Sequence, residues 1–316
     1  MKRVLLLLSF FAICLFGQQS LSPTQKIFAS GDVQDMIIKD NILYVATDAS
    51  KIDLIDLDTK EILSSITIPQ IKDFMGDIIN SKIYSVDVLG DDIIFVSEGE
   101  GGYRVLWRYK DEVLEKLIDI NSKYFIKKAR YIDSSTVLMG LLTNEHILYN
   151  IPKKELIYNT QFSTSSFSDF VLSEDKKQYI TTDESGIVRL VDTKSADIIK
   201  EYPSKNLDRI YQLDYKNGVI LTAGQDRKAV VYKAFDIYSM DFNFLLYACA
   251  LNQNATLGAI AYTMENDVLV FDVISKNRLY SLEEARATIT KILFINNKEI
   301  LVSSDSSQIN YYNIGE

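Results

Sequence analysis

The chain has 316 residues, a formal net charge of −9 and a single histidine. An acidic balance of this size disfavours nucleic acid or anionic lipid as a partner; it suits docking to a basic protein surface, and solubility alone would explain it equally well. One histidine excludes the multi-histidine copper and zinc centres and argues against a Ser–His–Asp triad.

Residues 1–17 have the layout of a secretory signal peptide. Lys2 and Arg3 form a short basic start, an apolar run broken only by Ser9 follows, and Gly17 offers a small residue for cleavage. The run is too short to span a bilayer comfortably, so we expect it to be removed on export, with an uncleaved anchor as the alternative. Residues 18–316 are then predicted to form one periplasmic domain without a membrane span.

Removal of this peptide leaves a mature chain with one cysteine and a formal charge of −11, because Lys2 and Arg3 are lost. Cys249 lies in the apolar stretch 245–251, where a thiol behaves as a small buried hydrophobe. No disulfide can form within the monomer, which is the expected state. Burial alone therefore has to stabilise the fold, and about 300 residues are ample for that.

One strand pattern recurs seven times along the mature chain, at 51–57, 103–108, 145–150, 187–192, 228–233, 267–272 and 308–313. In each copy a large apolar residue precedes the closing polar one. These residues are separated by 52 positions once and then by 39 to 42, a period typical of the four-stranded blades of a β-propeller. They are Ile55, Trp107, Tyr149, Val191, Tyr232, Phe271 and Tyr312.

The two ends of the mature chain are predicted to meet in one blade. The last repeat supplies three strands, at 289–294, 300–303 and 309–313, and an isolated strand near 25–29 is available as its fourth. Such pairing would seal the ring and leave no unpaired edge there. The sequence therefore predicts an all-β, seven-bladed β-propeller closed by its N-terminal strand, with six blades and a separate piece as the alternative.

The fourth repeat resembles the WD-repeat family. Residues 182–192 read Thr-Asp-Glu-Ser-Gly-Ile-Val-Arg-Leu-Val-Asp and are similar to the family stretch S-x-D-G-x-I-x-L-W-D, with Val191 at the Trp position. Trp107, the only tryptophan, falls on the same position in the second repeat. With one histidine the chain cannot assemble the His–Ser–Asp–Trp hydrogen-bond set of intact repeats. The resemblance thus implies a degenerate, WD-repeat-like propeller.

A carboxylate precedes each repeated strand. On one face of a propeller these groups could form an acidic ring at the channel mouth that binds a divalent cation, a small ligand or a basic segment. The favoured alternative is that they accept hydrogen bonds from the amides of tight turns. The candidate metal ligands are Asp48, Asp183, Asp226 and Asp305, and the remaining carboxylates are Glu100, Glu145 and Glu265.

Two segments are candidates for docking a protein. The long first spacing predicts an insertion at 73–92, with Gly90-Asp-Asp92 as a hairpin turn within it, and Asp73, Phe74 and Met75 at its start. The second segment, 238–247, carries Phe242 and Phe244. It either presents an apolar patch or, as we favour, packs as the fourth strand of the fifth blade.

No residue pattern points to catalysis or to a cofactor. His146 stands at the start of a predicted strand, where a hydrogen-bonded or solvated histidine is the ordinary interpretation, and the 13 glycines form no phosphate-binding loop. The single tryptophan argues against the docking motifs of quinoprotein propellers. We therefore expect a non-catalytic scaffold without cofactors.

The whole layout resembles the NapL-type accessory proteins of the periplasmic nitrate reductase system in campylobacter-like bacteria. The shared features are export, an acidic charge, about 300 residues rich in Lys, Ile and Asn, and degenerate WD-type repeats. This resemblance implies a non-catalytic periplasmic role in nitrate reductase maturation or electron transfer, performed by docking to components of that system.

Overall fold

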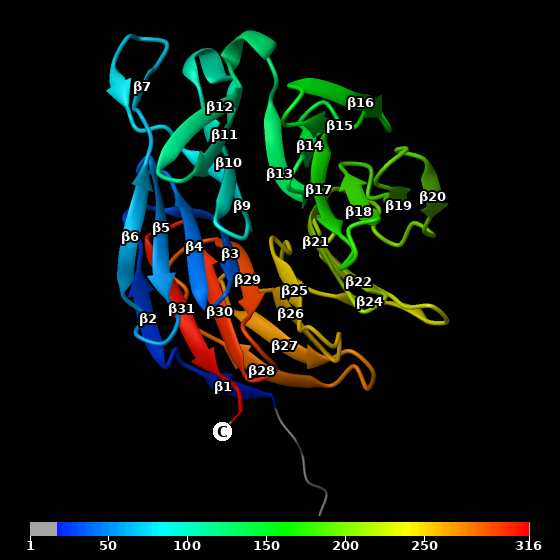
Figure 1. The fold of residues 1–316 in the computed structure, drawn as a ribbon. Helices are drawn as coiled ribbons and strands as arrows, with labels where there is room; N and C mark the ends of the chain where they lie inside the picture. Colours follow the sequence, from blue (N-terminus) through cyan, green and yellow to red (C-terminus); the bar gives the residue numbers. More distant parts are fainter. Residues whose placement is uncertain (1–17, 316) are drawn as a thin grey trace, which may run out of the picture.

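The computed structural model describes residues 18–315, so the predicted signal peptide lies outside the described residues. Seven antiparallel sheets stand in a ring around one axis as the blades of a β-propeller (Figure 1). Within residues 18–315 no helix is long and apolar enough to cross a membrane. The prediction of seven blades is confirmed.

In each blade the four strands are arranged in order from the central axis of the ring to its rim. The first blade contains β3 (Val33–Lys39), β4 (Ile42–Thr47), β5 (Lys51–Asp56) and β6 (Ile62–Thr67), and the second β9 (Ile83–Leu89), β10 (Asp92–Glu98), β11 (Arg104–Lys110) and β12 (Val113–Ile118). The third contains β13 (Ile126–Asp133), β14 (Thr136–Leu141), β15 (Glu145–Asn150) and β16 (Glu155–Gln161), and the fourth β17 (Phe167–Leu172), β18 (Gln178–Asp183), β19 (Val188–Asp192) and β20 (Ile198–Glu201).

The remaining blades repeat this order. The fifth contains β21 (Ile210–Lys216), β22 (Val219–Gly224), β23 (Lys228–Tyr232) and β24 (Ile237–Asp241), and the sixth β25 (Cys249–Leu251), β26 (Leu257–Ala261), β27 (Val268–Asp272) and β28 (Arg278–Leu282). The seventh contains β29 (Ile289–Phe294), β30 (Glu299–Ser304), β31 (Gln308–Asn313) and β2 (Gln25–Phe28). Two short 3-10 helices, η1 (Glu100–Gly102) and η2 (Ile120–Ser122), lie in the second blade and its exit.

Apolar side chains gather between neighbouring blades and form a core at each of the seven interfaces. The aligned residues of the repeat explain this arrangement, because each lies on the third strand of its blade and packs toward the preceding blade. Ile55, for example, joins the core between the seventh and first blades, and Trp107 the core between the first and second. All seven aligned side chains are at most 7% exposed. The repeat is therefore a packing pattern.

The N-terminal segment closes the ring as predicted. β2 pairs antiparallel with β31, with Ile27 opposite Ile309, and so completes the seventh blade. A second contact was not predicted: β1 (Gln19–Leu21) pairs in parallel with β28, at the rim of the sixth blade. The Gln18 side chain also donates to the Tyr262 hydroxyl at 3.1 Å. The start of the described chain thus ties two adjacent blades together (Figure 1).

The predicted insertion in the second blade is shorter than expected and begins earlier. It is a small hairpin, β7 (Ile71–Lys72) and β8 (Ile78–Ile79), placed between the first and second blades. Gly90, at a φ of 61°, belongs to the ordinary turn between β9 and β10, so it was wrongly assigned to the insertion. The wide turn around η1 accounts for part of the 52-residue spacing, so the spacing overstates the length of the insertion.

Candidate functional site

The first strands of the blades surround two cavities of about 530 and 200 Å³. The two cavities share Lys128, Gln212 and Lys291, and together they form the central channel. They meet where the wall is richest in charge. This channel is the candidate functional site.

A pairing irregularity near the start of the first strand recurs in six of the seven blades. The register shifts in β3, β9, β13, β17, β21 and β29. A β-bulge adds one residue to a strand and redirects the side chains beside it. The residues that follow the bulge are Asp35, Ser85, Lys128, Asp169, Gln212 and Lys291, and we call them, with Arg130, the belt. The bulges therefore set the direction of six side chains of the belt, all except that of Arg130.

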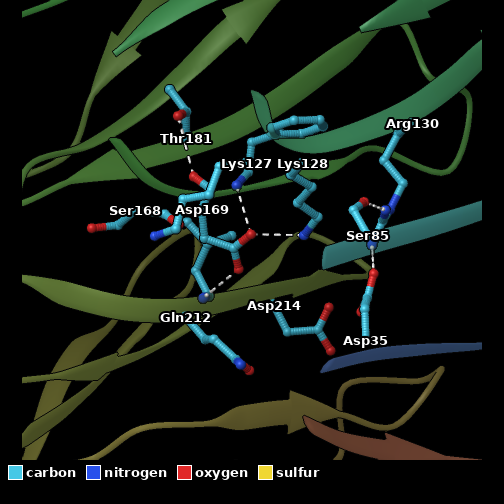
Figure 2. Close-up of polar contacts among 12 residues, drawn as sticks. Asp35, Ser85, Lys127, Lys128, Arg130, Ser168, Asp169, Thr181, Gln212 and Asp214 are labelled. Atoms are coloured by element: carbon cyan, nitrogen blue, oxygen red, sulfur yellow. Dashed lines mark hydrogen bonds and ion pairs between the residues drawn. The ribbon is translucent and has the colours of Figure 1, made fainter. Parts of the chain in front are cut away.

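Three ion pairs hold the charged members of the belt, and Figure 2 shows those of Lys128 and Arg130. Lys128 Nζ lies 2.7 Å from Asp169 Oδ1, and Arg130 Nη2 lies 3.0 Å from Asp35 Oδ2. Lys291 Nζ lies 3.4 Å from the other oxygen of Asp35. All five side chains are largely buried, and charges persist at such a depth only when they are paired. The pairs connect the seventh blade with the first, the first with the third, and the third with the fourth.

The charge states of the belt follow from its pairing. Burial raises the pKa of Asp35, but Lys291 and Arg130 outweigh this effect and hold the pKa at about 2. Burial lowers the pKa of Lys128 to about 8, against the attraction of Asp169. At neutral pH the belt is therefore an alternation of carboxylates and cations.

Carboxylates of the inner strands also bind the backbone of the next inner strand. Each accepts a hydrogen bond from an amide of the following blade, over 2.7 to 3.3 Å. The acceptors and donors are Asp35 and Val86, Asp87 and Tyr131, Asp169 and Leu213, and Asp214 and Leu251. These acids thus join neighbouring blades, and Asp35, Asp169 and Asp214 also line the channel.

Three of the four candidate metal ligands, Asp48, Asp226 and Asp305, lie in turns between second and third strands, and Asp183 is the last residue of the second strand of the fourth blade. Asp183 accepts from the Ser185 amide at 2.9 Å and from Arg189 Nη1 at 2.8 Å. Asp226 accepts from the Leu207 amide at 2.8 Å. Among residues 18–315 no three His, Cys, Asp or Glu side chains lie close enough together to hold a metal ion. The structure does not bring the four candidates into one site.

Two of these candidates do approach a third acid. Asp48 accepts from the Asp32 amide at 2.8 Å, and Asp305 lies near Asp32. Burial, and then the charges of Asp48 and Asp305, raise the pKa of Asp32. Acidic groups therefore do gather on the turn side of the seventh and first blades, where Lys82 offsets part of their charge.

His146 is buried completely, in the core between the third and fourth blades. The rings of Phe162, Phe167 and Tyr179 lie 4.8 to 5.4 Å from its own, and its Nε2 lies 3.3 Å from Thr181 Oγ1. Burial lowers its pKa to about 3, so the ring is neutral at physiological pH. It lines neither cavity of the channel, and its position is that of a core residue.

The two docking candidates differ in exposure. Phe74 and Met75, at the tip of the β7–β8 hairpin, are 94% and 72% exposed, and Asp73 accepts from the Met75 amide at 2.8 Å. Phe242 and Phe244 are half-buried beyond β24, the fourth strand of the fifth blade. Phe242 packs against Tyr262 with ring centroids 5.8 Å apart, and Phe244 stands 6.2 Å from Tyr247. Of the two candidates, the hairpin is the one that presents large apolar side chains openly.

Sequence reasoning missed the belt. Lys128 and Arg130 lie in a basic run, Asp169 and Lys291 are single charges among apolar and hydroxyl residues, and nothing in the repeat sets them apart. The usable signal would have been the register of each first strand against its second, since the bulge selects the residue that faces the channel.

Comparisons with known proteins identify the fold alone. No family model matches the chain, and no curated protein matches it. Among solved structures, the β-propeller domain of Cps50 (Swd1) from Myceliophteria thermophila is similar, with a TM-score of 0.74 over 92% of this chain and 98% of that domain. Its sequence identity is 12%, so the likeness extends to a WD-repeat-like seven-bladed propeller and no further.

Proposed function

We propose that this chain is an exported, non-catalytic scaffold that binds another protein through the β7–β8 hairpin and thereby supports periplasmic nitrate reduction. The observation that carries the docking proposal is the exposure of Phe74 and Met75. Large apolar side chains at the tip of a projecting hairpin gain free energy when a partner covers them, and aromatic and methionine side chains are enriched in such interfaces.

The hairpin is held well enough to present these side chains. Ile71 pairs with Ile79 and Lys72 with Ile78, and Asp73 fixes the turn by accepting from the Met75 and Asp77 amides. Loops on a rigid scaffold are where binding residues concentrate. The propeller supplies the rigidity, and the hairpin supplies a small apolar anchor.

Support for the pathway comes from the sequence. Export by residues 1–17 would place the scaffold in the periplasm, and the resemblance to NapL-type proteins points to nitrate reductase components as the partner. The proposed role, in maturation or electron-transfer coupling, needs contact rather than chemistry.

A deletion and complementation experiment tests both parts. Deleting the gene should lower periplasmic nitrate reductase activity without abolishing it, and the wild-type gene should restore it. The double variant Phe74→Ser with Met75→Ser should not restore activity. The matched control is Phe235→Ser, because Phe235 is also fully exposed but lies beyond β23 in the fifth blade.

The proposed pathway and the proposed docking element can be contradicted independently. Unchanged activity with normal reductase maturation in the deletion strain would contradict the pathway. Full restoration by the hairpin variant, at wild-type protein levels, would contradict the hairpin as the docking element.

A further inference from the structure

The larger cavity of the channel has the size of a small-molecule site. Its volume of about 530 Å³ lies within the range of about 300 to 1,000 Å³ that such sites usually have. The cavity begins at the belt and extends along the first strands away from the smaller cavity. Its wall changes character over that distance.

Beyond the belt, three of the first strands add apolar side chains to the wall. Side chains on one face of a strand recur every second residue, so Ile37 follows Asp35, Val171 follows Asp169, and Leu293 follows Lys291. All three apolar residues are half-buried and line the cavity. Three different blades thus provide an apolar surface next to the charged layer.

The charges that face this cavity are mostly positive. Its lining includes four cationic side chains, Lys128, Arg130, Lys216 and Lys291, and one carboxylate, Asp214. The partner carboxylates of the belt, Asp35 and Asp169, line the smaller cavity instead. Lys128 and Lys291 therefore line both cavities and Arg130 lines the larger one, whereas the carboxylates of the belt line only the smaller one.

We propose that the larger cavity binds an organic anion with an apolar body. The anionic group lies beside Lys128 and Lys291, and the apolar body lies along Ile37, Val171 and Leu293. The ion pairs with Asp169 and Asp35 hold these ammonium groups in place before the ligand arrives, which reduces the cost of ordering them. This inference concerns the channel and is independent of the docking hairpin.

The test compares an anionic probe with its uncharged counterpart. Anilinonaphthalene sulfonate carries a sulfonate on an aromatic body, and N-phenylnaphthylamine is the same body without the charge. The double variant Phe74→Ser with Met75→Ser serves as the background protein, because it lacks the exposed apolar tip that could bind either probe. Fluorescence titration should show one site for the sulfonate and at least tenfold weaker binding of the amine.

Two isosteric substitutions locate the site. Gln212 lines the cavity, so Gln212→Glu adds a negative charge there with nearly the same side-chain shape, at the loss of the hydrogen bond that Nε2 donates to the Thr290 carbonyl at 2.6 Å. Gln161→Glu is the matched control, because that exposed side chain on β16 donates to the Thr143 carbonyl at 2.7 Å. We expect roughly tenfold weaker sulfonate binding for Gln212→Glu, and no change for Gln161→Glu.

Two further measurements complete the test. Decanoate should displace the sulfonate probe, whereas decylammonium should not, and Lys216→Gln should weaken the probe severalfold without lowering the melting temperature. Equal affinity for the charged and uncharged probes, or unchanged sulfonate affinity in Gln212→Glu, would overturn the proposal.

Discussion

The belt and the β7–β8 hairpin invert the usual distribution of side chains. The belt buries five charged groups at the centre of the molecule, and the hairpin exposes Phe74 and Met75 at its edge. The belt persists because every charge has a partner from another blade. The hairpin keeps its shape through its strand pairing and the turn at Asp73, without burial of its apolar tip. The difference indicates that the ion pairs of the belt contribute to folding, whereas the exposed apolar tip of the hairpin does not.

The largest expected effect comes from making the same substitution, Asp to Asn, in the belt and in the hairpin and comparing the loss of stability. Asp35→Asn leaves Arg130 and Lys291 buried beside an uncharged amide, and removing one partner of a buried pair costs about 3 to 5 kcal/mol. Asp73→Asn in the hairpin should cost less than about 1 kcal/mol, because that turn is exposed. Urea unfolding measures both. Similar losses in the two variants would show that the belt is not structural.

A second prediction concerns a buried ionisable group without a charge partner. The pKa of His146 is about 3 in the folded protein and about 6.5 in the unfolded chain, so the unfolded state gains a proton first as the pH falls. Stability present above pH 6.5 is therefore lost as the pH falls toward 3, by about 2 to 3 kcal/mol near about pH 4.5.

The substitution His146→Gln separates this effect from the belt. Asp35 loses its contribution only below its ordinary value of 3.8, so a loss of stability in the window between pH 3.8 and 6.5 does not come from Asp35. Unfolding free energies measured across this window should depend less on pH in the variant. An equally steep dependence would mean that another group controls acid stability.

How far the sequence predicts this molecule depends on the range of each interaction. The third strands and the seven-blade count follow from a local pattern, because Ile55, Trp107 and their equivalents fill cores between sequential blades. The pairing of β2 with β31 follows from a missing strand. The belt could not be predicted, because it requires the bulge of each first strand and the meeting of non-adjacent blades. β1 has three residues and no apolar pattern, and its pairing depends on a neighbour already in place.

Substitutions at the tip of the hairpin should leave the stability of the fold almost unchanged, in contrast to those in the belt. Replacing Phe74 and Met75 by serine should change the free energy of unfolding by less than about 0.5 kcal/mol, since exposed side chains make few contacts in the folded state. Thermal unfolding measures this. A loss comparable to that of Asp35→Asn would mean that the tip packs against the propeller and is not a free docking surface.

The smallest expected effect is that of calcium. Asp183 and Asp226 already accept hydrogen bonds from backbone amides and side chains, and the four candidate ligands lie in four different blades. Among residues 18–315, no cluster of side chains therefore offers the six to eight oxygens that calcium prefers. Adding calcium in the millimolar range should move the melting temperature by no more than about 1 °C, the level of general screening of an acidic surface. A larger, saturable shift that Asp48→Asn or Asp305→Asn abolishes would instead assign a cation site to the acids around Asp32.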